Sequence, residues 1–217
     1  MIKKAFILFL ISFFLSIFYF ALNPQFNQNI NEESFNDFDV TIYRDRFGVP
    51  HIIGKKDKDT AYGLAYAHAE DDFETIQDMM LFARGKLASK KGRKMASSDY
   101  LLQLLKVWEV VNANYDSNIS AETKSILNGY AAGLNHYALK NPKMTHRGLF
   151  PVTAKDIVAG FVHRMPLMFG LDDAIKNATE KGNSEFAFLN YNTKGFDQKV
   201  LGSNQIAVAP SRSADGY

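Results

Sequence analysis

The chain of 217 residues has no cysteine and only one tryptophan, so disulfide bonds contribute nothing to its stability. It also lacks a Walker or dinucleotide-type glycine loop, a His-x-x-x-His zinc spacing and any internal repeat. The net charge is only +2, and no basic stripe or nucleic-acid-binding module is present. These absences argue against nucleotide, zinc and nucleic-acid partners.

An uncharged apolar run occupies residues 5–22 and follows Lys3 and Lys4. A basic start before an apolar stretch is typical of an export signal. At about 1.5 Å per residue the run would also reach roughly 27 Å, close to a bilayer core, so a retained membrane anchor is the alternative. Both alternatives predict that the chain leaves the cytoplasm. The lack of cysteine fits an exported protein that relies on its core.

The remainder is apolar enough, at 47% of the whole chain, to fold. Residues 23–37 are polar and predict a tether, so the fold is expected to begin near Phe38. Alternation over residues 40–43 and a β-prone stretch over 49–54 predict a hairpin. The basic residues 86–94 predict a solvated loop. The weak pattern over 182–202 indicates a loop or spacer, and residues 205–209 resemble a short buried strand.

Apolar spacing predicts four helices, beginning near residues 59, 99, 120 and 153. Thr153 and Asp156 have the spacing of a capping box for the fourth helix, and Pro166 is expected to kink or divide it. Trp108 of the second helix is interpreted as a core residue. The inward faces are expected to comprise Phe73, Ile76, Met80 and Ala83; Leu101, Leu104, Leu105, Trp108 and Val111; Ile126, Leu127, Tyr130, Ala131 and Leu134; and Ile157, Phe161, Met165 and Met168.

Gly202-Ser203-Asn204 lies between the spacer and the predicted strand. By itself this tripeptide indicates only a turn. A serine at a new N-terminus has a further chemistry, because its own α-amino group, with a pKa near 8, can take the hydroxyl proton. Cleavage before Ser203 would therefore create a nucleophile and its base on one residue. Gly202 would give the attacking hydroxyl room.

Two separated blocks carry a family resemblance. The first comprises Arg44-Asp45-Arg46-Phe47-Gly48-Val49-Pro50-His51-Ile52 and, after it, Ala61-Tyr62-Gly63-Leu64-Ala65-Tyr66-Ala67-His68-Ala69-Glu70-Asp71-Asp72. It resembles the opening of the α chain in the penicillin acylase family of N-terminal-nucleophile hydrolases, which includes acyl-homoserine-lactone acylases. The second, Gly202-Ser203-Asn204 with Ala207-Val208-Ala209-Pro210-Ser211, resembles the start of that family's β chain.

The resemblance implies an exported, periplasmic precursor that cuts itself before Ser203 and then hydrolyses a linear amide, such as a penicillin or an acyl-homoserine lactone, through an acyl-enzyme. It implies a mainly α fold here, with a short N-terminal β-hairpin, as part of the family's αββα fold, whose sheets are mostly missing. The divisions expected are a signal or anchor (1–22), a tether (23–37), an α-chain region (38–181), a spacer (182–202) and the start of a β chain (203–217).

Alignment with the family's pocket helix places Met165, Met168 and Phe169 at substrate-binding positions, with ordinary core packing as the alternative reading of these side chains. Some relatives bind calcium through an α-chain glutamate, but Ile175 stands there in this sequence, with Asp172 and Asp173 nearby. We therefore expect no metal and no cofactor. His51 is interpreted as a structural residue. His68, Glu70, Asp71 and Asp72 are not expected to bind metal, because consecutive helical residues point apart.

Only 15 residues run from Ser203 to Tyr217, whereas the family's β chain supplies the sheets and the oxyanion-stabilising groups. The expectation is an incomplete chain that is inactive alone and needs a separate or missing β chain as its partner, besides its small N-acyl amide substrate. The alternative is a non-catalytic, membrane-tethered helical protein of the cell envelope, in which Ser203 lies in a turn. A β-chain reading frame downstream would favour the enzyme.

Overall fold

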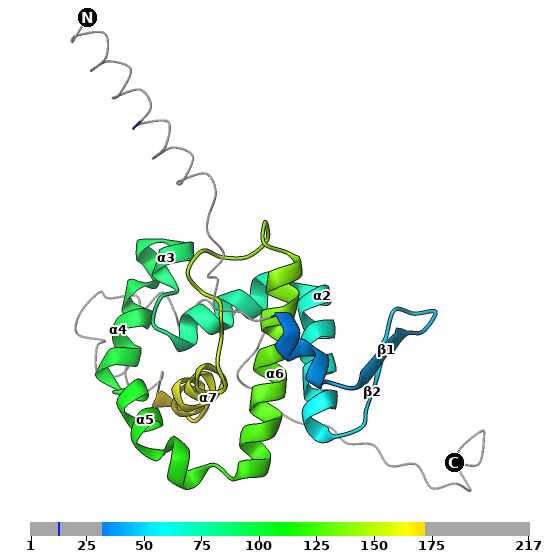
Figure 1. Cartoon of the computed structure of the whole chain (residues 1–217). Helices are drawn as coiled ribbons and strands as arrows, with labels where there is room; N and C mark the ends of the chain where they lie inside the picture. The colour runs from blue at the N-terminus through cyan, green and yellow to red at the C-terminus, as the bar shows by residue number, and fades with distance from the viewer. Residues whose placement is uncertain (1–12, 14–31, 172–217) are drawn as a thin grey trace, which may run out of the picture.

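The computed structural model of the chain describes Phe13 and residues 32–171. Helices predominate within this range, and two strands form one antiparallel hairpin that projects from the helical body (Figure 1). The predicted fold class is confirmed. The elements in chain order are η1 (Glu32–Asp37), β1 (Val40–Arg44), β2 (Pro50–Gly54), α2 (Asp57–Ala83), α3 (Ala88–Lys91), η2 (Arg93–Met95), α4 (Ala96–Leu104), α5 (Val107–Asn118), α6 (Ala121–Lys140) and α7 (Ala154–Met168).

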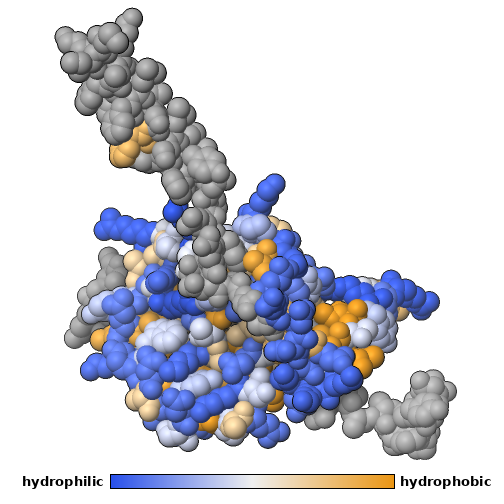
Figure 2. Space-filling model, viewed as in Figure 1, coloured by the Kyte–Doolittle hydropathy of each residue, from blue (hydrophilic) through white to orange (hydrophobic). Residues whose placement is uncertain are grey.

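The hairpin forms where the alternating pattern predicts it. Ile42 lies opposite Ile52, and Val40 lies opposite Gly54. These residues are half-buried, while Thr41, His51 and Ile53 face solvent, so one face of the ribbon packs on α2 and the other is exposed. Figure 2 shows apolar residues gathered on the side of the molecule that carries the hairpin.

The α2 and α6 helices pack side by side and form the frame of the molecule (Figure 1). Their close approach depends on small residues: Ala65 and Ala69 of α2 are fully buried. On α6 the matching positions are Gly129 and Gly133. A Cβ atom added to either glycine would lie 2.2 Å from a backbone oxygen of α2, that of Lys58 or Tyr62 respectively. Only glycine therefore permits this spacing.

The α2 helix bends at Asp72, which has non-helical angles (φ −152°, ψ 69°). The Asp72 side chain accepts a hydrogen bond from the backbone N–H of Thr75 at 3.1 Å, as an N-cap does, so it starts the second half of the helix. This half carries most of the core that α2 contributes. The core includes Phe73 and Leu81 of α2, Leu134 of α6, and Leu149 and Phe150 of the segment before α7.

The folded part begins earlier than the polar composition of residues 23–37 suggests. Glu32–Asp37 form η1, and Phe35 is buried. Its ring stacks on His136 of α6 at 4.5 Å, while the next aromatic residue, Phe38, stacks on Tyr62 at 4.4 Å. The Phe35 ring therefore anchors this polar segment to the fold, because it packs against the rings of His136 and Tyr62.

The prediction of a solvated basic loop over residues 86–94 is wrong. The segment contains α3 and the start of η2, flanked by the buried Leu87 and Met95. Lys90 and Lys91 pair with the buried carboxylate of Asp78 at 2.6 and 2.8 Å. The two ammonium groups thus neutralise the buried negative charge of Asp78 on α2. The sequence around residues 86–94 gives no indication of this partner.

The second predicted helix is two helices, α4 and α5. Lys106 lies between them in the left-handed conformation, with φ 52°. The break turns Leu104 toward solvent, contrary to its predicted place on an inward face, while Val111 is buried as expected. Trp108 packs against the core, and its indole N–H donates to the carbonyl of Ala83 at 2.9 Å, which confirms it as a core residue.

None of the helices in residues 32–171 is both long and apolar enough to cross a membrane. The apolar run 5–22 lies outside the described residues apart from Phe13.

Candidate functional site

Ser203 and Gly202, the predicted nucleophile and cleavage site, lie outside the described residues, as do Asp172, Asp173 and Ile175. Of the predicted site residues, the structure places Met165, Met168 and Phe169. All three lie at the C-terminal end of α7, which therefore forms the described part of the candidate site.

The α7 helix begins as the capping-box spacing predicts. The carboxylate of Asp156 accepts hydrogen bonds from the backbone N–H of Thr153 at 2.7 Å and from its hydroxyl at 2.8 Å. Asp156 is buried, and its second partner is Arg84 at the end of α2. The helix continues through Pro166 to Met168, so of the two predicted effects of Pro166, a kink or a division, the division does not occur. Pro166 lies in the last turn, where few helical residues remain to be disturbed.

The predicted inward face of α7 is largely wrong. Ile157 is buried as predicted, but the main buried side of the helix carries Asp156, Ala159 and His163, at positions i, i+3 and i+7. The other predicted residues point outward: Phe161 is 64% exposed, Met165 42%, Met168 50% and Phe169 80%. Helical spacing alone assigned the wrong side of α7 to the core because the helix is apolar on both sides. The side that packs against α2 and α5 is the one with the smaller apolar residue Ala159.

These four side chains recur at positions i, i+4, i+7 and i+8, so they form one apolar stripe, here called the α7 stripe. Their exposure excludes the alternative that they pack in the core of residues 32–171. Four large apolar side chains on one exposed flank are typical of a surface that binds a partner or an apolar ligand.

His163 is the buried polar residue behind the stripe. It is fully buried and stacks on Phe82 of α2 at 4.0 Å, and within the described part of the chain neither ring nitrogen has a hydrogen-bond partner. Burial lowers the pKa of His163 to about 4, and an interaction with the Phe82 backbone opposes this shift only in part. The imidazole is therefore neutral at pH 7 and acts as a packing residue.

We expect the fold to lose stability as the pH falls from about 6.5 to about 4 because of His163. In that window the unfolded chain binds a proton that the folded chain does not, so the free energy of unfolding falls by an amount on the order of 3 kcal/mol. Chemical denaturation at pH 7, 5.5 and 4.5 measures this fall. A His163→Leu variant should show a flatter pH dependence than the wild type. Equal slopes for wild type and His163→Leu would contradict the assignment.

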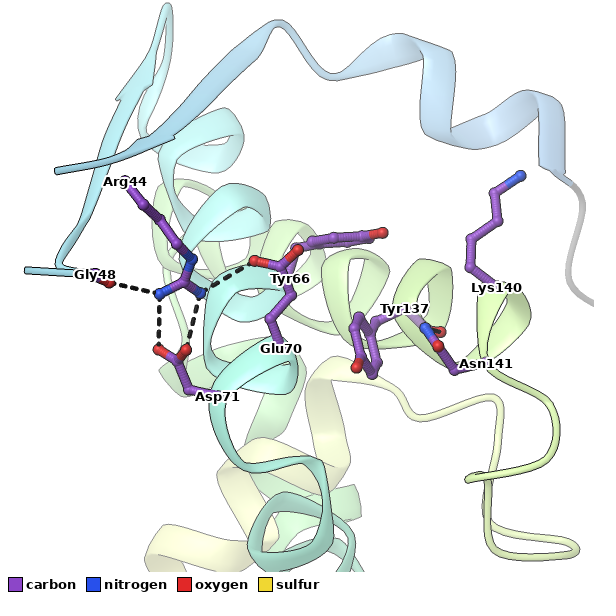
Figure 3. Close-up of a pocket in the computed structure, with 8 residues that line it drawn as sticks. All are labelled: Arg44, Gly48, Tyr66, Glu70, Asp71, Tyr137, Lys140 and Asn141. Carbon is purple, nitrogen blue, oxygen red and sulfur yellow. Dashed lines mark hydrogen bonds and ion pairs between the residues drawn. The ribbon is translucent and has the colours of Figure 1, made fainter. Parts of the chain in front are cut away.

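A second surface feature is an open hollow of about 750 Å³ between the hairpin, α2 and the end of α6. Figure 3 shows Arg44 reaching from the hairpin toward two carboxylates of α2. The Arg44 guanidinium lies 3.1 Å from Glu70 and 2.9 Å from Asp71, and it donates to the carbonyl of Gly48 at 2.8 Å. The side chains that line the rest of the hollow are Tyr66, Tyr137, Lys140 and Asn141.

The Arg44 contacts in this hollow connect the hairpin to α2. Glu70 first, and then Asp71, raise the pKa of Arg44 by hydrogen bonding to its charged form. His68 is turned away and contacts the Tyr130 hydroxyl at 3.1 Å, while Asp72 caps the second half of α2. Among the described residues no group of three or more His, Asp or Glu side chains could hold a metal. We therefore leave the hollow outside the candidate site.

His51 also serves the hairpin. Its ring stacks on Tyr43 of the opposite strand at 4.7 Å, and Nε2 lies 3.4 Å from the Asp45 carboxylate. Asp45 accepts backbone hydrogen bonds from Phe47 and Val49, which close the turn, and the Phe47 N–H is the main cause of its lowered pKa. These contacts agree with a structural role for His51.

Sequence reasoning missed two residues that shape α7, Arg84 and His163. Arg84 lies in the stretch before a basic segment, and its partner is 72 residues away. The capping-box spacing identifies Asp156, but a second partner at that separation leaves no local signal. His163 could have been suspected from its place between Ala159 and Leu167, at helical spacing on one apolar face.

Comparison with known proteins gives consistent relatives. The chain is 31% identical over 201 residues to an acyl-homoserine lactone acylase, PvdQ, of Pseudomonas fluorescens (strain Pf0-1), covering 81% of this chain and 25% of that protein. It is 30% identical over 98 residues to the penicillin acylase 2 proenzyme of Pseudomonas sp. (strain SE83), covering 45% and 12%. A thermostable penicillin G acylase from Alcaligenes faecalis aligns with 18% identity and a TM-score of 0.48, over 78% of this chain and 97% of that one.

The chain spans about a quarter of the length of the curated acyl-homoserine lactone acylases that it matches. The family model described as Penicillin amidase matches residues 39–217 of this chain. That range includes the hairpin, all the α helices described above, the α7 stripe and Ser203. The chain therefore belongs to the penicillin amidase family.

Proposed function

We propose that the chain is part of an amidohydrolase that cuts itself between Gly202 and Ser203 and uses Ser203 as its N-terminal nucleophile. The observation that carries the proposal is the family match, whose range of residues 39–217 includes both the hairpin and Gly202-Ser203-Asn204. One relative is named a proenzyme, which supports processing of a precursor.

The proposed self-cleavage begins with an attack of Ser203 on its own peptide bond. The Ser203 hydroxyl attacks the carbonyl carbon of Gly202, and the peptide bond is exchanged for an ester. Water then hydrolyses the ester, which leaves a carboxylate on Gly202 and a free α-amino group on Ser203. Glycine before the serine permits the backbone angles that bring the hydroxyl to the carbonyl.

The proposed catalysis repeats the same attack on a substrate. The Ser203 hydroxyl adds to the amide carbonyl of an N-acyl substrate while its proton passes to the α-amino group, directly or through a water. The amine product leaves with a proton, and the acyl-enzyme ester is hydrolysed by water to the free acid. Stabilisation of the oxyanion belongs to a β chain, which we propose as the partner of residues 39–202.

We propose that the α7 stripe supplies part of the acyl-binding surface. Met165, Met168 and Phe169 are exposed and uncharged, and their neighbour Arg164 is turned toward Met79 of α2, with 3.9 Å between Nη1 and Sδ. An apolar surface of this kind favours an uncharged acyl group, because burying a carboxylate against it would leave the charge unpaired. A penicillin or an acyl-homoserine lactone, the substrate types that the relatives' names suggest, both meet this requirement.

We also propose that the protein is exported and acts in the periplasm or cell envelope. The apolar run over residues 5–22 after two lysines supports export, either as a cleaved signal or as an anchor.

The proposal predicts a new N-terminus at Ser203. The test is to express the gene together with any coding sequence downstream, and then to determine the N-terminal residues and intact masses of the purified product. The expected result is one chain that begins Ser-Asn-Gln-Ile and hydrolysis of N-acyl amides. An uncut product without amidase activity would refute the proposed function.

A further inference from the structure

We propose that Arg84 is a positioning residue that sets the orientation of α7 and thereby the shape of the acyl-binding surface. The inference rests on the proposed function of the α7 stripe. It goes further by assigning a specificity role to a residue outside the stripe.

The guanidinium of Arg84 donates four hydrogen bonds, from all three of its nitrogen atoms. Nε donates to Asp156 Oδ1 at 2.6 Å, and Nη2 donates to Asp156 Oδ2 at 2.8 Å. Nη2 also donates to the carbonyl of Pro151 at 2.9 Å, and Nη1 donates to the carbonyl of Leu149. The Arg84 side chain is 19% exposed and that of Asp156 is 2% exposed. These are four charge-assisted hydrogen bonds in a largely desolvated place, where such bonds are strong and directional.

The bonds converge on the start of α7. Asp156 is the residue that caps the helix through Thr153, so its carboxylate joins the helix N-terminus to the end of α2. Leu149 and Pro151 belong to the segment that leads into the helix. Asn135 of α6 holds the same segment from the other side, through two hydrogen bonds with the backbone of Val152 at 2.8 and 2.9 Å. The entry to α7 is therefore fixed from two helices.

The stripe extends from Phe161 to the opposite end of the helix. Met168 is 12 residues beyond Asp156, which corresponds to about 18 Å along a helix. Between the two ends the helix is held by apolar packing, through Ile157 and Ala159 and the stacking of His163 on Phe82. Apolar contacts carry little directional information, whereas a bidentate ion pair fixes both distance and angle. A small rotation at Asp156 would therefore move the stripe while the helix stayed packed.

The test is Arg84→Lys in the active, processed protein, with an N-acyl amide series of increasing acyl length. Lysine keeps the charge beside Asp156 but cannot form the fork or reach both carbonyls. The expected result is a KM about tenfold higher for the longest acyl chain, with kcat/KM for the shortest changed less than about twofold, because misplacement by about 1 Å affects most the substrate that spans the stripe. Asp156→Asn tests the same fork from its other side and should give the same pattern.

Arg44→Lys is the matched control, because it breaks another arginine fork whose partners, Gly48, Ala67, Glu70 and Asp71, are not on α7. Its acyl-length profile should equal that of the wild type. Thermal melting and circular dichroism confirm that each variant is folded at the assay temperature.

A uniform loss of kcat over all acyl lengths would overturn the positioning role, because it would mean only a smaller active fraction. The same conclusion would follow if neither Arg84→Lys nor Asp156→Asn folded, since the ion pair would then hold the domain together rather than orient α7. An uncut, inactive wild type would instead refute the proposed function, and this role with it.

Discussion

A Ser203→Ala variant is expected to remain one uncut chain and to hydrolyse no amide above background. Alanine lacks the hydroxyl that would attack the Gly202 carbonyl, so no new α-amino group forms and both halves of the proposed catalytic pair are absent. Loss of the nucleophile in another serine hydrolase lowers kcat on the order of a millionfold. Intact mass spectrometry and an amide-hydrolysis assay on the same preparation measure the two effects together.

Ser211→Ala is the matched control, because Ser211 lies in the same family block, eight residues beyond Ser203. It should be processed and active like the wild type. Cleavage at position 203 in the Ser203→Ala variant would show that another protease cuts the chain, and retained amidase activity would show that the nucleophile is a different residue. Both results are incompatible with the proposed mechanism.

A Gly133→Ala variant is expected to lose about 3 kcal/mol of folding free energy, the upper end of the range for overpacked cores. The new Cβ would lie 2.2 Å from the Tyr62 carbonyl oxygen and 2.9 Å from the Ala65 Cβ, so α2 and α6 must move apart. No side-chain rotation relieves a clash with backbone. Alanine favours the helical state by about 1 kcal/mol over glycine, which offsets only part of the cost.

Urea denaturation of both proteins measures the difference, and differential scanning calorimetry should show a lower Tm. Gly160→Ala is the matched control, since Gly160 is also helical and its added Cβ would meet only the Ala83 Cβ at an ordinary 3.6 Å. We expect that variant to be as stable as the wild type or slightly more stable. A Gly133→Ala protein with wild-type stability would mean that α2 and α6 are not in the close contact described.

Features governed by neighbouring residues were predictable. The hairpin was predicted from alternation over residues 40–43 and the β-prone stretch 49–54, and it formed with Ile42 opposite Ile52. The predicted helix start near residue 120 was also correct, because Ser120 caps α6 by accepting a hydrogen bond from the Thr123 N–H at 3.1 Å. The helix positions were predicted wrongly at two places. Residues 86–94 contain short helices whose lysines pair with Asp78, and Lys106, in the left-handed conformation, separates α4 from α5.

In the candidate site, too, some features were predictable from sequence and others were not. Alignment with the family's pocket helix predicted Met165, Met168 and Phe169 as substrate-binding residues. Their exposure was not predictable, because α7 has apolar residues on both sides and either side could have faced α2. Only the packing of Ala159 and His163 against the body decided which side is buried.

The strand alternation, the helix caps and the family blocks around Arg44 and Ser203 can be recognised without a structure, since each depends on residues close together in the chain. The tertiary structure decided which flank of α7 is exposed, which lysines compensate Asp78 and how Arg84 orients α7. These outcomes join residues up to 72 positions apart, so they follow from how the helices pack and not from any local pattern.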